Sequence, residues 1–300
     1  MKCTTILDAI GNTPIVSIPC DTACEIWAKA EFLNPGGSIK DRVALRMIEA
    51  AEQRGVLRPG STLVEPSSGN TGIAMALVGV QKGYRVIIVM PEDMSEERKK
   101  IIAAFGGELE LTPKEANIEG ACNRAAELVA EIEGAVMLQQ FENPDNPAVH
   151  YDQTGPEIWL DLHSQVHAFV AGIGSGGTFA GVGKFLREHN PDIHLAAVEP
   201  ANSAALLGHE PGLHSIPGIG DGFIPAVLDT SLINEVITVS DQDAIETTRR
   251  LAREQGLLVG TSSGANVWAA RKLARELPAG SVIATVLPDR AERYFSTALI

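Results

Sequence analysis

The chain has 300 residues, of which 45% are hydrophobic and 21% are charged, a composition typical of a folded protein of one or two domains. Its formal net charge of −14 and the lack of a basic run argue against nucleic acid and anionic membrane as partners. No apolar run reaches about 18 residues and no signal-peptide pattern opens the sequence, so we expect a cytoplasmic protein with no membrane span.

The four cysteines are too few for a disulfide framework and are expected to be reduced thiols. Cys20 and Cys24 have the spacing of half a zinc site, but no second pair of ligands follows them. We therefore expect no bound metal.

The stretch NPGGSIKDR, residues 34–42, combines a tight turn with the start of a helix that is expected to run to about Gly55. Lys40 falls in the first turn of this helix. Unpaired N–H groups and the positive end of the helix dipole disfavour a second positive charge there, which lowers the pKa of an amine. Such a lysine can be a nucleophile, a Schiff-base former or a proton shuttle, although a solvated lysine is an equally simple interpretation.

Residues 61–138 alternate short apolar runs with amphipathic runs. We expect strands at 61–65, 85–90, 108–111 and 135–138, and helices ending near Lys82 and covering 95–105 and 117–131. The first strand leads into the loop PSSGNTG, residues 66–72. Hydroxyl groups and consecutive N–H groups at a helix N-terminus suit a carboxylate or another anion, whereas helix capping by Ser68 or Asn70 is the structural alternative.

Between Phe141 and Pro156 the periodicity lapses and three prolines occur, which indicates a crossover between two α/β halves. In the second half we expect strands at 167–173, 193–198, 236–239 and 282–287, and helices ending near His189 and covering 241–254 and 265–276. Residues 208–225 are expected to form a mobile loop. The alternation predicts an α/β fold of mostly parallel sheets with helices on both faces.

The glycine-rich loop GSGGT, residues 174–178, follows the first strand of the second half. Its N–H groups could converge on a phosphate, and Thr178 adds a hydroxyl at a helix start. The same region matches the dinucleotide pattern G-x-G-x-x-G at 172–177, and Glu199 ends the next strand where a ribose-binding acid is expected. Taken alone, this match favours a nicotinamide-dependent oxidoreductase. A third loop, GTSSGA at 260–265, suits a capped helix start or a further ligand contact.

The combination of these loops separates the two interpretations. A dinucleotide reductase has no need of a lysine turn and an SSGNTG loop in its other half. A pyridoxal-phosphate enzyme needs a lysine for the aldehyde, a phosphate cup, partners for the ring and an anion pocket for the carboxylate of an amino acid. The chain supplies each of these, and its lysine also argues against a non-catalytic binding protein.

Motifs spread along nearly the whole chain, and in the right order, resemble the cysteine synthase (O-acetylserine sulfhydrylase) family, of the tryptophan-synthase β class of pyridoxal-phosphate enzymes. They are NPGGSIKDR (34–42), PSSGNTG (66–72), QQFENPDNP (139–147), TGPEIW (154–159), GIGSGGT (172–178), GIGDGFIP (218–225), VGTSSGA (259–265) and ERYFS (292–296). The resemblance implies the type II fold of pyridoxal-phosphate enzymes, with two three-layer α/β domains. Residues 36–144 would form the smaller, mobile domain, residues 1–35 with 145–300 the larger one, and the cofactor would lie in the cleft between them.

The resemblance also implies a role for each residue that matches a motif of the family. Lys40 would form the internal aldimine and later move the α-proton of the substrate. The remaining contacts would be Gly174, Ser175, Gly176, Gly177 and Thr178 for the phosphate, Asn70 for the 3′-oxygen, Ser262 for the ring nitrogen, and Ser67, Ser68, Gly69, Thr71 and Gln140 for the substrate carboxylate.

The implied activity is a β-replacement in which O-acetylserine loses acetate, leaves an enzyme-bound aminoacrylate, and gains sulfide to become L-cysteine. Cystathionine β-synthase and cysteine desulfhydrase activities use the same intermediate and stay open. Asp221 departs from the family, which often has a small apolar residue there, and is either a solvated loop residue or a specificity residue for cysteine or homocysteine. The resemblance further implies a homodimer and, as in some members, binding of the C-terminal tail of serine acetyltransferase.

Overall fold

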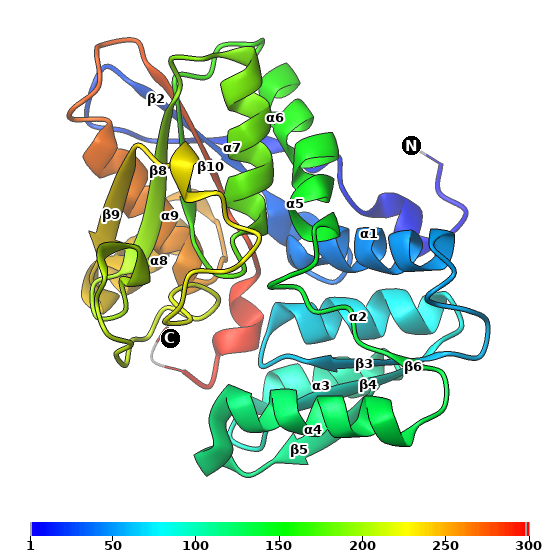
Figure 1. Cartoon of the computed structure of the whole chain (residues 1–300). Coiled ribbons are helices and arrows are strands. Elements are labelled where there is room, and N and C mark those ends of the chain that lie inside the picture. Colours follow the sequence, from blue (N-terminus) through cyan, green and yellow to red (C-terminus); the bar gives the residue numbers. More distant parts are fainter. Residues whose placement is uncertain (1, 298, 300) are drawn as a thin grey trace. The chain divides into compact units, whose positions relative to one another are not determined.

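The computed structural model describes residues 2–297 and 299 and divides them into two units, each with its own sheet (Figure 1). The first unit takes in the described residues up to Ile10 together with Asn34–Asp145. The second takes in Gly11–Leu33 and the described residues from Asn146 onward. The expected grouping put residues 1–35 in the larger domain, whereas the described residues up to Ile10 group with the first unit.

A parallel sheet with the strand order β5-β4-β3-β6 forms the middle of the first unit. Its strands are β3 (Thr62–Pro66), β4 (Arg85–Pro91), β5 (Glu108–Thr112) and β6 (Ala135–Val136), and its helices are α1 (Lys40–Gln53), α2 (Asn70–Gln81), α3 (Glu96–Ala104) and α4 (Asn117–Glu131). The expected alternation of strands and helices is confirmed, although β6 is shorter than the sequence predicted.

Side chains of β3 and β4 alternate between the two faces of this sheet, as the period of two in a strand requires. Val64, Ile87 and Val89 share a core with buried residues of α4. On the other face, a Cβ added to Gly79 of α2 would lie 2.6 Å from a methyl carbon of Val86. Helices therefore cover both faces, and α2 comes close because a glycine faces the sheet.

The second unit contains a sheet with the strand order β1-β2-β10-β7-β8-β9. Its strands are β1 (Ile15–Ile18), β2 (Glu25–Lys29), β7 (Ala168–Gly172), β8 (His194–Pro200), β9 (Glu235–Val239) and β10 (Val282–Val286). Only β1 runs antiparallel to its neighbour among these strands. The helices are α5 (Asp145–Val149, which starts at the boundary), α6 (Gly155–Asp161), α7 (Gly177–His189), α8 (Asp241–Gln255) and α9 (Thr261–Leu273).

Alternation along β7 likewise builds two cores. Phe169 and Ala171 pack with buried residues of α7, whereas Ala168 and Val170 pack with buried residues of α9. The mixed α/β architecture with mostly parallel sheets confirms the predicted fold class. Because parallel strands end at one edge of a sheet, the loops after β7 and β10 lie along the same edge of the second unit.

Two segments differ from the sequence prediction. The hairpin of β1 and β2 was not expected, and the crossover at 141–156 contains helix where an irregular segment was expected. Residues His150–Thr154 form a π-helical turn between α5 and α6. Pro147 lies in the first turn of α5, where proline is tolerated because the missing N–H would have no helical partner, and Pro156 directly follows the π-helical turn.

Lys29 ties β2 to α6 inside the second unit. It is 1% exposed, and its Nζ donates to the carbonyl oxygen of Thr13 at 2.6 Å. The same Nζ lies 2.8 Å from a carboxylate oxygen of Asp161 and 3.0 Å from one of Glu157. A buried ammonium with this many acceptors contributes to stability chiefly because removing it would leave carboxylates without their cation.

Candidate functional site

The turn before α1 places Lys40 at the first residue of that helix. The N–H of Gly37 donates to the carbonyl oxygen of Asn34 at 2.8 Å, and the φ of Gly37 is 81°, a conformation that favours glycine. The Asp41 carboxylate accepts the N–H of Gly36 at 2.5 Å, and a Cβ on Gly36 would lie equally close to Asp41 Oδ1. This turn therefore fixes the half-buried Lys40 at the N-terminus of α1, where the helix dipole is positive.

The loop between β3 and α2 is held from inside by Ser67. Ser67 is buried, and its Oγ accepts the N–H of Gly72 at 2.9 Å and that of Gly69 at 3.3 Å. The hydroxyl that accepts from the first turn of α2 thus belongs to Ser67, whereas the capping alternative assigned this role to Ser68 or Asn70. Ser68, Gly69 and Asn70 are half-buried at the helix N-terminus, where N–H groups lack helical partners.

Thr71 and Gln140 are far apart in the sequence, but their side chains are in contact in the first unit. Thr71 Oγ1 donates to Gln140 Oε1 at 2.7 Å, and both residues are buried. The contact brings the amide side chain from the segment after β6 to the N-terminal turn of α2. Hydroxyl, amide and N–H groups gathered at a helix N-terminus are suited to an anion such as a carboxylate.

In the second unit, residues 174–178, here called the cup, lead the chain from β7 into α7. A Cβ on Gly174 would lie 2.1 Å from the carbonyl oxygen of Gly218, and a Cβ on Gly177 would lie 2.0 Å from Asn146 Oδ1. Gly174 therefore accepts only glycine, because the close atom is backbone, whereas a Cβ at Gly177 would require the Asn146 side chain to shift. The backbone N–H groups of a glycine-rich turn at the N-terminus of a helix form a concave site for a phosphate.

Side chains that the sequence analysis missed support the cup. Asn146 Nδ2 donates to Ser175 Oγ at 3.0 Å. The buried His150 lies 3.3 Å through Nε2 from Thr178 Oγ1, and 3.0 Å through Nδ1 from Thr154 Oγ1. His150 belongs to the π-helical turn, a feature that is frequent at functional sites. Asn146 lies in the quoted motif 139–147 and His150 lies in none, but no role was assigned to either, because only the packing of the crossover against α7 reveals these contacts.

The acid on which the nicotinamide alternative depended is engaged elsewhere. Glu199, in β8, is buried, and its carboxylate accepts the N–H of Leu206 at 3.1 Å and the N–H of Ala205. Burial raises the pKa of the Glu199 carboxyl. Because this carboxylate holds the turn at 205–207, it does not serve as a ribose ligand, and the glycine pattern loses its expected partner.

Ser262 is a buried residue in the first turn of α9. One turn further along, Asn266 fixes the helix to the sheet, since its Nδ2 donates to the carbonyl oxygen of Val286 at 2.9 Å and its Oδ1 accepts the N–H of Gly172 at 2.8 Å. Gly172 and Val286 are the last residues of β7 and β10. The N-terminus of α9 therefore lies at the same edge of the sheet as the cup.

The segment 218–222 lies against the cup. The N–H of Gly220 donates to the carbonyl oxygen of Ile173 at 2.9 Å, and the carbonyl oxygen of Gly220 accepts from Ser203 Oγ, also at 2.9 Å. Asp221 is the next residue and is exposed. The hydrogen bonds of Gly220 to Ile173 and Ser203 therefore fix the backbone next to Asp221.

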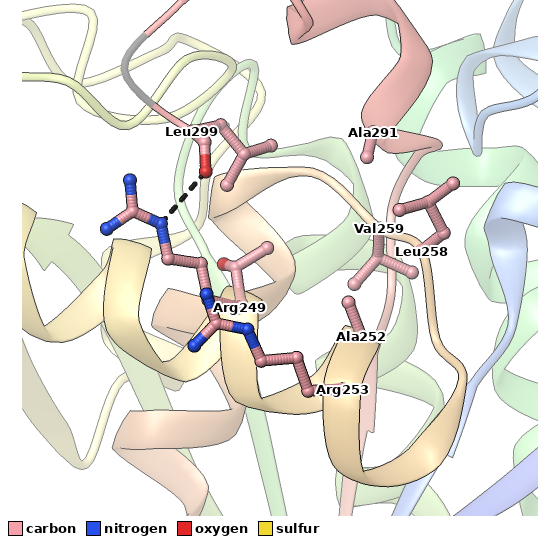
Figure 2. A pocket seen from close by; sticks show the side chains of 8 residues that line it. Arg249, Ala252, Arg253, Leu258, Val259, Ala291 and Leu299 are labelled. Carbon is pink, nitrogen blue, oxygen red and sulfur yellow. Dashed lines mark hydrogen bonds between the residues drawn. The ribbon is translucent and has the colours of Figure 1, made fainter.

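A separate cavity of about 250 Å³ lies between α8 and the last described residues of the second unit (Figure 2). Its lining includes Arg249, Arg253, Leu258 and Leu299, and Arg249 Nε donates to the carbonyl oxygen of Leu299 at 3.0 Å. The cavity contains none of the site residues predicted from the sequence, so it does not belong to the candidate site.

The predicted site residues fall into two groups, one in each unit. The first unit holds Lys40, Ser67, Ser68, Gly69, Asn70, Thr71 and Gln140, and the second holds Gly174, Ser175, Gly176, Gly177, Thr178, Asp221 and Ser262. Gly176, the residue before α7, has a φ of 79° and so also favours glycine. One edge of the sheet in the second unit thus carries closely packed glycines, a helix N-terminus and a buried serine. This combination fits a phosphorylated ring cofactor.

Among residues 2–297 and 299, no helix has the length and apolarity that a membrane crossing would need. The same residues contain no group of three His, Cys, Asp or Glu side chains able to hold a metal ion.

Residues 6–289 match the family described as pyridoxal-phosphate dependent enzymes. The chain is 48% identical over 298 residues to a cysteine synthase of Staphylococcus aureus strain N315, and the match covers 98% of this chain and 96% of that protein. It is also similar to the solved structure of an O-acetylserine-dependent cystathionine β-synthase from Helicobacter pylori, at 45% identity and a TM-score of 0.94, with 100% and 99% of the two chains covered. A hydrogen sulfide-producing enzyme from Fusobacterium nucleatum is similar at 39% identity and a TM-score of 0.94, with 98% and 100% covered.

These matches span nearly the whole chain and confirm both the expected resemblance and its cofactor class. The chain belongs to the pyridoxal-phosphate dependent enzyme family.

Proposed function

We propose that this protein is a pyridoxal-phosphate-dependent β-replacement enzyme that makes L-cysteine from O-acetylserine and sulfide. The observation that carries the proposal is the cup, in which Gly174 and Gly177 leave no room for a Cβ, in a chain 48% identical to a cysteine synthase. The reaction needs an amine, a phosphate site and a carboxylate site, and the sequence provides residues of the right chemistry for each.

Side chains and N–H groups of this chain would hold the cofactor. The N–H groups of the cup and the Thr178 hydroxyl would donate to the phosphate, at the positive end of α7. Asn70 would donate to the ring oxygen, and Lys40 would bind the aldehyde carbon through its amine. When bound, pyridoxal phosphate withdraws electrons from the α-carbon of an amino acid, which acidifies the α-proton and allows a β-substituent to leave.

Ser262 would be the partner of the ring nitrogen, and its chemistry favours replacement over transamination. A serine hydroxyl can donate to a neutral ring nitrogen, but it cannot stabilise a protonated one as a carboxylate would. A neutral ring withdraws electrons less strongly, so prompt loss of a β-substituent is favoured over a long-lived negative charge on the α-carbon.

The substrate carboxylate would bind to Ser67, Ser68, Gly69, Thr71 and Gln140. The Thr71–Gln140 hydrogen bond and the N–H groups of the first turn of α2 support this assignment, because both suit an anion. Lys40 would remove the α-proton and return it after sulfide has added. The carboxylate residues and Lys40 belong to the first unit and the cup belongs to the second, so the proposal needs both units.

The purified protein tests this proposal directly. We expect a yellow protein whose absorption band reports a lysine-bound cofactor, and cysteine formation from O-acetylserine and sulfide. Lys40→Ala should lose both, whereas Lys184→Ala, which removes an exposed lysine of α7, should keep both. A colourless protein, or a Lys40→Ala variant with an unchanged band, would contradict the assignment.

One observation favours a second reaction at the same site. The backbone next to Asp221 is bound to the residue before the cup, and two similar structures are named for cystathionine β-synthase and hydrogen sulfide production. We propose that the Asp221 carboxylate contacts an amino group or activates water, which favours cysteine or homocysteine as a substrate. Sulfide release and cysteine synthesis should be compared in wild type, Asp221→Asn and Asp221→Ala. An unchanged ratio in both variants removes this role.

Two partners are proposed from the resemblance. We propose a cytoplasmic homodimer, which light scattering of the purified protein would detect as twice the mass of the chain. We also propose that the C-terminal tail of serine acetyltransferase binds where the substrate carboxylate does, since its terminal carboxylate suits the N-terminus of α2. A peptide of that tail should then compete with O-acetylserine, and an amidated peptide should compete less.

A further inference from the structure

Glu65 is a buried carboxylate of the first unit to which the proposed reaction gives no role. It precedes the last residue of β3, just before the SSGNTG loop, and is 3% exposed. Its Oε2 accepts the N–H of Leu138 at 3.0 Å and that of Gln139 at 3.2 Å, and its Oε1 accepts the N–H of Gln140 at 3.4 Å. The Glu65 carboxylate thus accepts the backbone N–H groups of three consecutive residues.

These donors belong to a segment that has just left the sheet. Pairing of β3 with β6 ends at Leu63 and Val136, so the following N–H groups have no strand partner. Gln139 has a φ of 58°, which is uncommon for a residue other than glycine. The Asn143 side chain donates to the carbonyl oxygen of Leu138 at 2.8 Å, which fixes the far side of the turn. The Glu65 carboxylate takes the place of the missing strand, because buried N–H groups need an acceptor.

The segment that Glu65 holds carries the side chain that meets α2. Gln140 accepts the Thr71 hydroxyl at 2.7 Å, and its own N–H is bound to Glu65. Thr71 follows Glu65 after a short loop. The piece of chain from β3 to α2 therefore contacts Gln140 twice. The Glu65 carboxylate accepts the backbone N–H of Gln140, and the Thr71 hydroxyl donates to its side-chain oxygen.

We propose that Glu65 is a positioning residue for the substrate: by accepting the N–H groups of 138–140 it holds Gln140 against Thr71, and this anchor sets the affinity for the carboxylate of an amino acid. The inference rests on the proposed function, which assigns Thr71 and Gln140 to that carboxylate. Burial raises the pKa of Glu65 to about 7, since desolvation outweighs the three N–H bonds that favour the charged form. Around neutral pH the carboxyl is thus only partly charged, which limits its repulsion of a bound anion.

Three variants separate positioning from general stability. Glu65→Ala removes every acceptor, Glu65→Gln keeps one oxygen for the two shorter bonds, and Val64→Ala removes buried methyl groups from the neighbouring residue without touching 138–140. We expect Glu65→Ala to raise the KM for O-acetylserine by at least about tenfold, with a much smaller change in kcat. Glu65→Gln should stay within about threefold of wild type, and Val64→Ala should keep the wild-type KM despite a lower unfolding midpoint.

Two measurements without turnover accompany the kinetics. The dissociation constant for L-alanine, which has the carboxylate but no leaving group, should rise with Glu65→Ala as the KM does, measured by calorimetry on the holoenzyme. Hydrogen exchange at 138–140 should become faster in Glu65→Ala and not in Val64→Ala. Should Glu65→Ala not fold, Glu65→Asp carries the same test, because a shorter side chain cannot keep all three bonds.

The outcomes distinguish this inference from the function on which it rests. A wild-type protein without the lysine-bound absorption band would refute the proposed function itself. An active wild type whose Glu65→Ala variant keeps the KM and the L-alanine affinity would overturn the positioning role. The same holds if Val64→Ala weakens binding as much as Glu65→Ala does, or if Glu65→Gln gives no rescue.

Discussion

Replacing Glu65 with glutamine should change how the stability of the protein depends on pH. Burial raises the pKa of this carboxyl to about 7, compared with an ordinary value of 4.5. One pKa unit corresponds to about 1.4 kcal/mol, so ionising Glu65 lowers the free energy of unfolding by about 3 kcal/mol. Glutamine has no proton to release, so the variant lacks this cost at every pH.

The direction follows from which state holds the proton more tightly. The folded state does, so the contribution of Glu65 to stability is complete below a pH of about 4.5 and is lost as the pH rises through about 7. Between pH 5.5 and 8.5 the loss amounts to about 2 kcal/mol, and this range stays above the sequence pI of 4.9. On α4, burial and next the charge of Glu65 raise the pKa of the Cys122 thiol.

Urea unfolding of wild type and Glu65→Gln at a series of pH values measures the effect. The free energy of unfolding of the variant minus that of wild type should rise by about 2 kcal/mol from pH 5.5 to pH 8.5. Val64→Ala is the control, and its difference from wild type should stay flat. A flat difference for Glu65→Gln, or a carboxyl carbon signal of Glu65 that titrates near 4.5 by NMR, would refute the burial argument.

Further substitutions test the cup and the buried ion cluster. Gly177→Ala should weaken cofactor affinity about tenfold to hundredfold in equilibrium dialysis, because the new Cβ would lie 2.0 Å from Asn146 Oδ1, and adding Asn146→Ala should recover part of the loss. An equal affinity of Gly177→Ala and wild type would contradict the cup geometry. Lys29→Met should lower the free energy of unfolding by about 1–3 kcal/mol in urea, since it leaves the partly buried Glu157 and Asp161 carboxylates without their cation. Arg250→Ala, which breaks an ion pair that is half exposed on both sides, should change it by less than about 0.5 kcal/mol, and similar losses in the two variants would contradict this ranking.

Most of the fold could be predicted where hydrophobic periodicity is strong. The run that became β4 is short, apolar and rich in β-branched residues, and the apolar residues of α7 recur at helical spacing, so the type of each was clear. The β1–β2 hairpin was missed because its strands are short and lie among cysteines, prolines and threonines. The helices around His150 were missed because prolines were interpreted as breakers, although Pro147 in the first turn of α5 interrupts no helical hydrogen bond.

The candidate site was predictable where chemistry depends on local pattern. Glycine-rich loops between a strand and a helix are visible in sequence, and the close contacts at Gly174 and Gly177 explain why those positions are glycine. Glu65 and Asn146 were not predicted as site residues, because their partners lie far along the chain. A charged residue inside an otherwise apolar strand is the one signal that could have drawn attention to Glu65, since a buried carboxylate requires donors.

The contact between Gly174 and Gly218 joins backbone to backbone, so no rotatable side chain can absorb a shift of either loop. An engineer who transplants residues 218–222 from a relative with another product range would therefore alter retention of the coenzyme along with selectivity. Libraries built at Asp221 should be screened first for holoenzyme content and only then for product, so that loss of colour is not mistaken for a changed preference.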